Sequence, residues 1–600
     1  MNPSFNLEHY ALRSRNYFEQ LVDAEGLPYF NVFWLDPIQG AALEAAHDWP
    51  DFGDVMSRQW QGAIFLRRMT GETAATESVW QRKILSLIDP ADGLLHRPKT
   101  TFSENVADWG DASLTLYALV TAAVDSGSPA LRQAAARMAE ALLKRLQDGQ
   151  YPGDCFAVKG LMVAARELGC EAALEAARLL LARLVGIGRQ PYGRLFTPDN
   201  LFAPMGHTHS NLRSMAGALD YALTVGDPVL YSRMEALYRF VKGTGARFGF
   251  LPEAIHWRKS DMIGCETCAL MDFAGVGVTL ANHGHAEYWG DMERLARNQY
   301  VESQLTEASW PALEGEPAAA DTPQFTWRDL ARRMVGAWAG WTSPNHILAY
   351  CESLNAHWGG PELKNKTRLL QNCCGGSGVH GLFTLWKNAA HFDAASNTLS
   401  VNMHLDKLLP QAEIRCEQPY RGVLRIAMKS DCQVNVRVPE FVKTVHSGYG
   451  SSTEASVFIN GVELPHTPGL GAALPAGAER PPARLNGNIL QIGPCLAGDQ
   501  IEVRYPLPLS TEEVAVGNPG YRQWRYRVTW KGDTVVRMEA LDNELPSTYS
   551  DFDQAERPVF YGENGPGRLY QREHFLSDAP PTSAPLHLDD GALNFWNLTP

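Results

Sequence analysis

The sequence predicts a mainly α-helical protein with a β-rich C-terminal part: an (α/α)6 toroid followed by one or two β-sandwich domains. Three observations predict it. Ala/Leu-rich helical patterns fill roughly the first two thirds of the 600 residues. Glycine turn signals recur between these patterns, and short alternating segments replace them from about residue 395. A chain of this length exceeds one compact core, so several domains are expected.

The N-terminal part is expected to consist of helix pairs. Segments 130–147 and 171–185 are rich in Ala, Leu, Arg and Glu, with apolar residues three and four positions apart, which is the period of a helix face. Repeated helix–turn–helix units build either a closed toroid around a cleft or an open solenoid. We expect a toroid over residues 1–395. The turn signals between helical patterns stand at Gly71, Gly127, Gly169, Gly226 and Gly284.

Short strands are predicted over residues 396–510. Segments such as "GVLRIAMKS", "CQVNVRVPEF" and "DQIEVRYPL" alternate apolar and polar residues between turn residues. This period indicates antiparallel strands with one buried face, as in a β-sandwich. A Pro/Ala/Gly-rich stretch, 466–483, is expected to be a long loop. We expect residues 511–600 to form a second small β domain or a strap against the first domain.

Composition excludes several classes of partner. The 53 Lys and Arg residues face 67 Asp and Glu residues, so the net charge is −14, which argues against nucleic acid and anionic lipid. The sequence shows neither an apolar membrane span nor an N-terminal signal segment. We therefore expect a cytoplasmic protein with no nucleic-acid or membrane partner. Abundant aromatic residues (16 Trp, 20 Tyr, 23 Phe) suit carbohydrate binding, although most such residues fill cores.

Cysteines stand in two tight clusters. The segment "GCETC" holds Cys265, Glu266 and Cys268, and Cys373 and Cys374 are adjacent about a hundred residues later. Adjacent cysteines rarely bond to each other, because a disulfide needs Cα atoms about 4.4–6.8 Å apart and neighbours lie at about 3.8 Å. Thiolates with a carboxylate suit tetrahedral zinc. The spacing leaves three interpretations open: a zinc site, buried inert thiols or a redox pair.

Other polar residues are candidates for chemistry. Glu253 stands among apolar residues, where a glutamate can hold a raised pKa and act as a general acid, or it is an ordinary solvated side chain. His207 and His209 stand where a helix is expected to begin, as metal ligands, capping groups or ligand contacts. Asp51 or Asp54 is a candidate cap of the helix that follows it.

Two segments resemble a known family. They are "CETCALMDFAGVGVTLANHGHAEYWGDMERLARNQY" and "NCCGGSGVHGLFTLWKNAA", and they are similar to the β-L-arabinofuranosidases of glycoside hydrolase family 127. The motifs are Glu-Thr-Cys at 266–268, Asp-Met-Glu-Arg at 291–294, one residue shorter than the family's Asp-x-x-Glu-Arg, and Cys-Cys at 373–374, within a likeness over roughly 50–540. The resemblance implies an (α/α)6 catalytic domain with β-sandwich domains after it.

The resemblance also implies roles for individual residues. It implies zinc as a cofactor, and its ligands would be Glu266, Cys268, Cys373 and Cys374. Cys265 falls outside this set. Cys373 stands where the family has its nucleophile. His207 matches a Gly-His ahead of a helix, and His207, His209 and Glu293 are expected to bind substrate.

The sequence departs from the family at two places. The family's acid/base glutamate stands about sixteen residues before Glu-x-Cys, where this chain has Phe250. Glu253 is the nearest substitute and our candidate acid/base, with Glu352 as the next carboxylate to test. The family usually has Cys-Cys-Pro-Pro-Asn where this chain has "CCGGSG", which implies a different sugar or aglycone. We expect the glycines at 375–376 to let the backbone approach the sugar.

These residues predict a retaining exo-glycosidase for a furanoside such as a β-L-arabinofuranoside. A zinc-bound thiolate would attack the anomeric carbon, and a carboxylic acid would protonate the leaving oxygen and then deprotonate water. One alternative is another (α/α)6 enzyme, a polysaccharide lyase or an unsaturated-uronyl hydrolase, which has no use for these thiols. The other is a non-catalytic glycan-binding protein with structural zinc. A carbohydrate is the expected partner, bound by a monomer or a homodimer.

Overall fold

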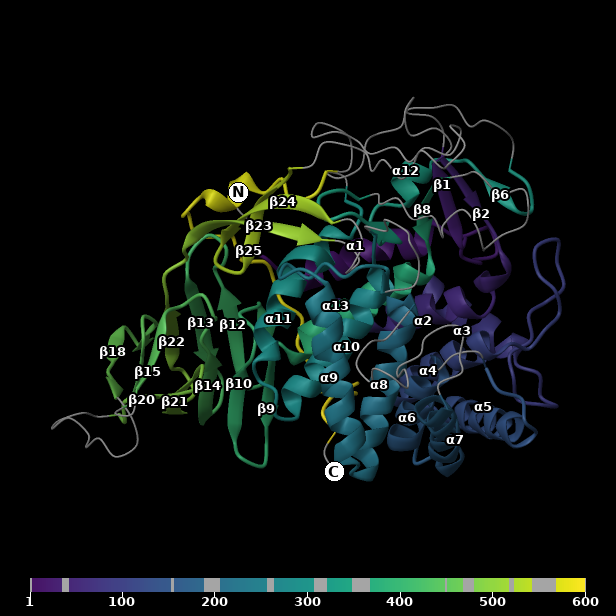
Figure 1. The fold of residues 1–600 in the computed structure, drawn as a ribbon, viewed down its shortest axis with the longest axis horizontal. Coiled ribbons are helices and arrows are strands. Elements are labelled where there is room, and N and C mark those ends of the chain that lie inside the picture. The colour runs from purple at the N-terminus through teal and green to yellow at the C-terminus, as the bar shows by residue number, and fades with distance from the viewer. Residues whose placement is uncertain are drawn as a thin grey trace.

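A helical body forms the N-terminal part of the protein, and β-sheets lie beside it (Figure 1). The predicted order, helices first and strands afterwards, is confirmed. The computed structural model describes residues 3–34, 43–152, 156–187, 206–255, 264–306, 321–347, 367–447, 450–467, 480–516, 523–541 and 568–598.

Six helices form a closed inner ring. Each contacts the next, and the last contacts the first. They are α2 (Asp54–Thr70), α4 (Trp109–Ser126), α6 (Phe156–Leu168), α8 (Thr208–Val225), α10 (Thr267–Asn282) and α13 (Cys373–Asn388). Outer helices pack against the ring: α1 (Leu7–Gln20), α3 (Thr76–Leu87), α5 (Pro129–Gln147), α7 (Glu171–Ile187), α9 (Pro228–Thr244) and α11 (Tyr288–Leu295). The closed ring confirms the toroid and excludes an open solenoid.

The burial of each helix follows from its sequence pattern. Inner helix α13 is buried along its whole length, as expected for a helix with neighbours on every side. Outer helix α5 buries one stripe at three- and four-residue spacing and exposes its other face. That stripe is Leu131, Ala135, Met138, Ala139, Leu142 and Leu146.

Glycines make the turns between inner and outer helices. All five predicted turn glycines have positive φ, from 66° at Gly169 to 109° at Gly284, a conformation that costs other residues energy. Because each hairpin returns the chain to its starting side, every inner helix begins at the same end of the ring. The first residues of these helices therefore gather at one place.

Short strands lead into the inner helices at that end. Strand β3 (Gly206–His207) pairs with β4 (Ala254–Ile255) and runs into α8, and β5 (Cys265–Glu266) pairs with β7 (Trp341–Thr342) and runs into α10. Strand β8 (Thr367–Gln371) leads to α13. It is the edge of a four-stranded sheet with β1 (Asn31–Trp34), β2 (Leu43–Ala46) and β6 (Phe325–Thr326).

Two six-stranded sheets form a sandwich after α13. Their orders are β19-β20-β21-β14-β10-β9 and β11-β12-β13-β22-β17-β18, and their inner faces share one apolar core. The strands are β9 (Ala390–Asp393), β10 (Thr398–Val401), β11 (Lys407–Leu408), β12 (Ala412–Cys416), β13 (Val423–Met428), β14 (Cys432–Arg437), β17 (Ser456–Ile459), β18 (Val462–Leu464), β19 (His466–Thr467), β20 (Ala483–Asn486), β21 (Ile489–Cys495) and β22 (Gln500–Arg504). Strands β15 (Thr444–Ser447) and β16 (Gly450–Thr453) form a separate hairpin.

The C-terminal part packs against the helical body. Strands β23 (Leu509–Val516), β24 (Trp524–Lys531) and β25 (Thr534–Ala540) form an antiparallel sheet whose buried side chains join the helical core. Phe595 and Trp596 are buried in the same core. The division at residues 395 and 510 stays a prediction. Among the helices that the structure describes, none combines the length and apolar composition needed to cross a bilayer.

Four short helical segments are also present among the described residues. They are η1 (Trp49–Asp51), η2 (Ala296–Tyr300), α12 (Leu330–Arg333) and η7 (Glu573–Leu576).

Candidate active site and metal centre

Cys373 and Cys374 are the first two residues of α13, directly after the N-cap residue Asn372. A helix N-terminus presents backbone N–H groups without helical partners, and these favour negative charge on nearby side chains. This position therefore favours thiolates. The cysteines stand at the helix start because only Asn372 separates the end of strand β8 from the first residue of α13.

The glycines after the cysteine pair serve helix packing. A Cβ atom at Gly375 would lie 2.0 Å from Tyr17 Oη, and one at Gly376 would lie 2.0 Å from the Arg58 carbonyl oxygen. Gly378 and Gly381 meet Trp338 and Tyr300 in the same way. Protein atoms therefore fill the side of residues 375–376 where a side chain would stand, and the approach of their backbone to the sugar stays a prediction. These glycines let α13 pack tightly against its neighbours.

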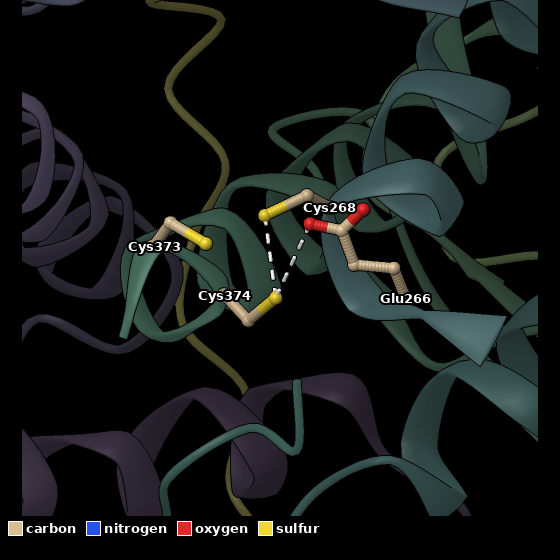
Figure 2. Close-up of side chains that lie close together, drawn as sticks. All are labelled: Glu266, Cys268, Cys373 and Cys374. Carbon is tan, nitrogen blue, oxygen red and sulfur yellow. Dashed lines mark hydrogen bonds between the residues drawn. The ribbon is translucent and has the colours of Figure 1, made fainter. Parts of the chain in front are cut away.

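The four predicted zinc ligands converge. Sγ of Cys268, Cys373 and Cys374 and a carboxylate oxygen of Glu266 all lie within 4.8 Å of one another. The Cys268 and Cys374 sulfurs are 3.3 Å apart, and Cys374 Sγ lies 3.9 Å from Glu266 Oε1 (Figure 2). Three thiols and one carboxylate in a buried place match what zinc prefers.

Cys265 faces away from this cluster. Strand β5 contains both Cys265 and Glu266, and neighbouring strand residues point to opposite faces. The Cys265 sulfur accepts a hydrogen bond from the Leu251 backbone N–H at 3.4 Å. Burial raises the pKa of its thiol well above the usual range. Cys265 is thus a buried thiol outside the cluster, and the two cysteines of the CxxC pattern, Cys265 and Cys268, do not belong to the same group of candidate ligands.

The electrostatics distinguish Cys373 from the other two thiols. Hydrogen bonds from Cys268 and Cys374 lower the pKa of Cys373 to about 6. Burial raises the pKa of both donors. Cys373 also keeps 8% of its surface exposed, whereas Cys268 and Cys374 keep none. Cys373 is therefore the thiol within reach of a ligand.

His207 joins a second glutamate to the cluster. Its Nε2 lies 2.8 Å from Glu266 Oε2 and 3.2 Å from Glu253 Oε1. Burial, followed by the charge of Glu266, raises the pKa of Glu253 to about 7. Burial also opposes charge on Glu266, but His207 and His209 outweigh it and lower the pKa of Glu266 to about 2. Burial opposes charge on His207, but the two glutamates hold its pKa well above the usual range. Neighbouring carboxyls with separated pKa values can divide acid and base roles.

Sequence reasoning missed two charged residues behind the cluster. Arg58 Nη1 donates to Cys268 Sγ at 3.7 Å and to Ser377 Oγ at 3.1 Å. Asp272 accepts from His209 Nδ1 at 2.8 Å. Their sequence spacing could have indicated both residues, because side chains four positions apart share one face of a helix. Asp272 stands four residues after Cys268 on α10, and Arg58 stands four residues after Asp54 on α2.

His209 and Glu293 lie apart from the surface that a ligand can reach. His209 is 3% exposed and is held between Asp272 and Arg58. Glu293 has no exposed surface and forms ion pairs with Arg297, at 2.8 Å, and with Arg437 of the sandwich. The expectation that these two residues bind substrate is corrected, because both side chains are enclosed by protein partners. Glu352 lies outside the described residues.

The comparisons with known proteins concern the fold. No family model matches the chain, and no curated protein matches it in sequence. A GH127 β-L-arabinofuranosidase from Geobacillus stearothermophilus T6 matches with a TM-score of 0.55 and 14% identity, covering 88% of this chain and 80% of that one. A second GH127 β-arabinofuranosidase matches with 0.54 and 14%, over 88% and 81%. The chain therefore has a GH127-like fold.

Proposed function

We propose that the protein is a retaining exo-glycosidase acting on a furanoside-type sugar such as a β-L-arabinofuranoside. Cys373 would be its nucleophile and Glu253 its acid/base. The observation that carries the proposal is the meeting of three thiols and two buried glutamates at one end of a GH127-like helical ring. The sugar is suggested by the enzymes that share the fold, since their names state that substrate.

The donor set supports a zinc ion held by Glu266, Cys268, Cys373 and Cys374. When bound, zinc would keep the thiols deprotonated at neutral pH and hold them in one direction. The surrounding charges suit such a centre. Arg58 and His207 both lie within hydrogen-bond distance of the ligands, so they offset the negative charge of three thiolates and a carboxylate.

Cys373 is proposed as the nucleophile because its thiol is the one with exposed surface. Its Sγ attacks the anomeric carbon as the bond to the leaving oxygen breaks, which gives a covalent thioglycosyl enzyme. Water then attacks the same carbon and releases the Cys373 thiolate. Two displacements at one carbon retain its configuration.

Glu253 is proposed as the acid/base. Its raised pKa keeps a proton available near neutral pH. The carboxyl gives this proton to the leaving oxygen in the first step and takes one from the attacking water in the second. His207 hydrogen-bonds Glu253 Oε1 and orients the carboxyl, and the Trp341 indole lies near it as a second donor. Oε2 forms no hydrogen bond of ordinary geometry within the described residues. The half-buried His207 is our candidate for contact with the sugar.

Metal analysis and a panel of 4-nitrophenyl glycosides, β-L-arabinofuranosides first, test the proposal. We expect zinc in the purified protein and a covalent sugar on the peptide that contains Cys373, detected by mass spectrometry after rapid quenching. Protein that holds zinc and binds glycans but turns over no glycoside would be a non-catalytic binding protein. Cleavage of uronic-acid-containing glycans, but of no glycoside in the panel, by protein without metal would favour a lyase or a uronyl hydrolase.

A further inference from the structure

Three ligand atoms converge beside the thiol cluster. They are His207 Nε2 and one carboxylate oxygen each of Glu253 and Glu266, all within 4.8 Å of one another. Nε2 lies 2.8 Å from Glu266 Oε2 and 3.2 Å from Glu253 Oε1. Zinc bonds to nitrogen and oxygen of about 2.0–2.1 Å place tetrahedral ligands about 3.3 Å apart. Small shifts of these side chains would therefore accommodate an ion.

Glu266 belongs to both groups. Its Oε1 lies 3.9 Å from Cys374 Sγ, and its Oε2 faces His207. A carboxylate with one oxygen toward each of two neighbouring metals suits two-metal sites, whose ions lie about 3.5–4 Å apart. The arrangement therefore leaves room for a second ion next to the thiol cluster.

Two independent features point to a ligand. His207 Nδ1 lies 2.8 Å from Ser210 Oγ, and an acceptor on the other ring nitrogen orients a metal-binding histidine toward its ion. Glu253 Oε2 is buried and forms no hydrogen bond of ordinary geometry in the described part of the chain, and its carboxyl has the Trp341 indole as a neighbouring donor that lowers its pKa. The His207 side chain is 29% exposed, so an ion and its water can reach the group.

We propose that His207, Glu253 and Glu266 form a second, weaker zinc site whose occupation inhibits the enzyme. The inhibition rests on the proposed function, because an ion on Glu253 occupies the carboxyl that must carry the proton. The site is weaker than the thiol site for two reasons. It holds no thiolate, and the two cations repel each other across Glu266.

Zinc titration of the full-length, zinc-loaded protein tests the proposal. Native mass spectrometry should count one tightly held zinc per chain and a second at higher zinc concentration, with hydrolysis falling as the second binds. Cobalt(II) separates the sites. The ion in the thiol site produces a sulfur-to-metal charge-transfer band, and the second ion adds absorption without increasing that band.

Variants assign the second ion to these side chains. Glu253→Gln and His207→Ala should each weaken the second zinc about 100-fold or more, since even outer partners of metal ligands are worth about 10–100-fold. The first zinc should remain. Glu104→Gln makes the same change of charge on an exposed side chain and should keep both ions.

Binding of a single zinc at every concentration would overturn the proposal, as would a second zinc unaffected by both variants. These failures are distinct from failure of the proposed function. If one zinc binds and Glu253→Gln still impairs acid catalysis, the second metal site is rejected and the proposed function stands. If Cys373→Ser keeps full turnover, the proposed function is rejected, and the proposed inhibition is rejected with it.

Discussion

Two buried glutamates, Glu253 and Glu293, lie in opposite environments of one chain. Glu253 meets a single histidine at the end of the helical ring, and burial together with Glu266 raises its pKa to about 7. Glu293 lies between two arginines at the contact of the helical body with the sandwich. Burial opposes its charge, but the arginines lower its pKa to about 2. The charged neighbours of a glutamate, and not its residue type, therefore decide whether its carboxyl can exchange a proton or stays charged.

The two glutamates also differ in how completely their own oxygens are paired. Both oxygens of Glu293 are bonded, one to Arg297 and the other to Arg437 and the His404 backbone N–H. Glu253 has only His207 and the nearby Trp341 indole as donors, and its Oε2 forms no hydrogen bond of ordinary geometry in the described residues. A carboxylate with both oxygens bonded to charged partners holds two parts of a protein together, whereas a carboxyl with spare polar capacity is available to a ligand. Four substitutions test this contrast.

Cys373→Ser should produce the largest loss of activity. A hydroxyl is a far weaker nucleophile and zinc ligand, so turnover should fall by at least about 10⁴-fold on aryl glycosides of any leaving group. Cys265→Ser is the matched control, because that sulfur lies outside the cluster and a hydroxyl can still accept from Leu251 N–H. Comparable turnover in both variants would contradict the assignment of the nucleophile.

Glu253→Gln should lower activity by about 10²–10⁴-fold on substrates with poor leaving groups and less on activated ones, since these need little protonation. A general acid works while protonated, so wild-type kcat/KM should fall as the pH rises through about 7. The variant should lose this alkaline decline. Equal losses on both kinds of substrate, or an unchanged pH profile, would assign the role to another carboxyl.

Glu293→Gln should reduce stability and spare catalysis. Removing one partner from a buried ion pair costs about 3–5 kcal/mol, because the arginines lose their counter-charge. The lowered pKa contributes stability above the ordinary value near 4.5, and this is lost as the pH falls toward 2. Denaturant unfolding of the variant and of the exposed control Glu104→Gln should therefore differ at pH 7 and converge in acid. A large drop in kcat with unchanged stability would return Glu293 to the site.

Gly376→Ala should have the smallest effect. The added methyl group would press on the Arg58 backbone oxygen between α13 and α2, and overpacking of this kind costs about 1–3 kcal/mol. Gly243→Ala on outer helix α9 is the control, because a Cβ there meets no atom within 4 Å. Unchanged unfolding with weaker substrate binding would show that Gly376 faces the sugar after all.

Local sequence pattern predicted the helical and β-rich parts of this protein, and the resemblance to a known family predicted the members of its thiol cluster. Helical periodicity and the five turn glycines follow from short-range sterics, so helix pairs and the change to strands could be predicted. Cys268, Cys373, Cys374 and Glu266 could be found because their motifs resemble those of a known family. The alternation of a two-residue strand, which turns Cys265 away while Glu266 faces the cluster, became visible only in the structure.

Only the tertiary structure decided what surrounds each of these side chains. Ring closure brings α13 against α2 and thereby places Arg58 beside Cys268. The same packing turns the glycines after Cys374 into helix contacts, and docking of the sandwich encloses Glu293 between arginines. Such contacts join residues up to about 320 positions apart. Sequence periodicity reports which face of an element is buried, but the identity of the neighbour depends on how distant elements pack.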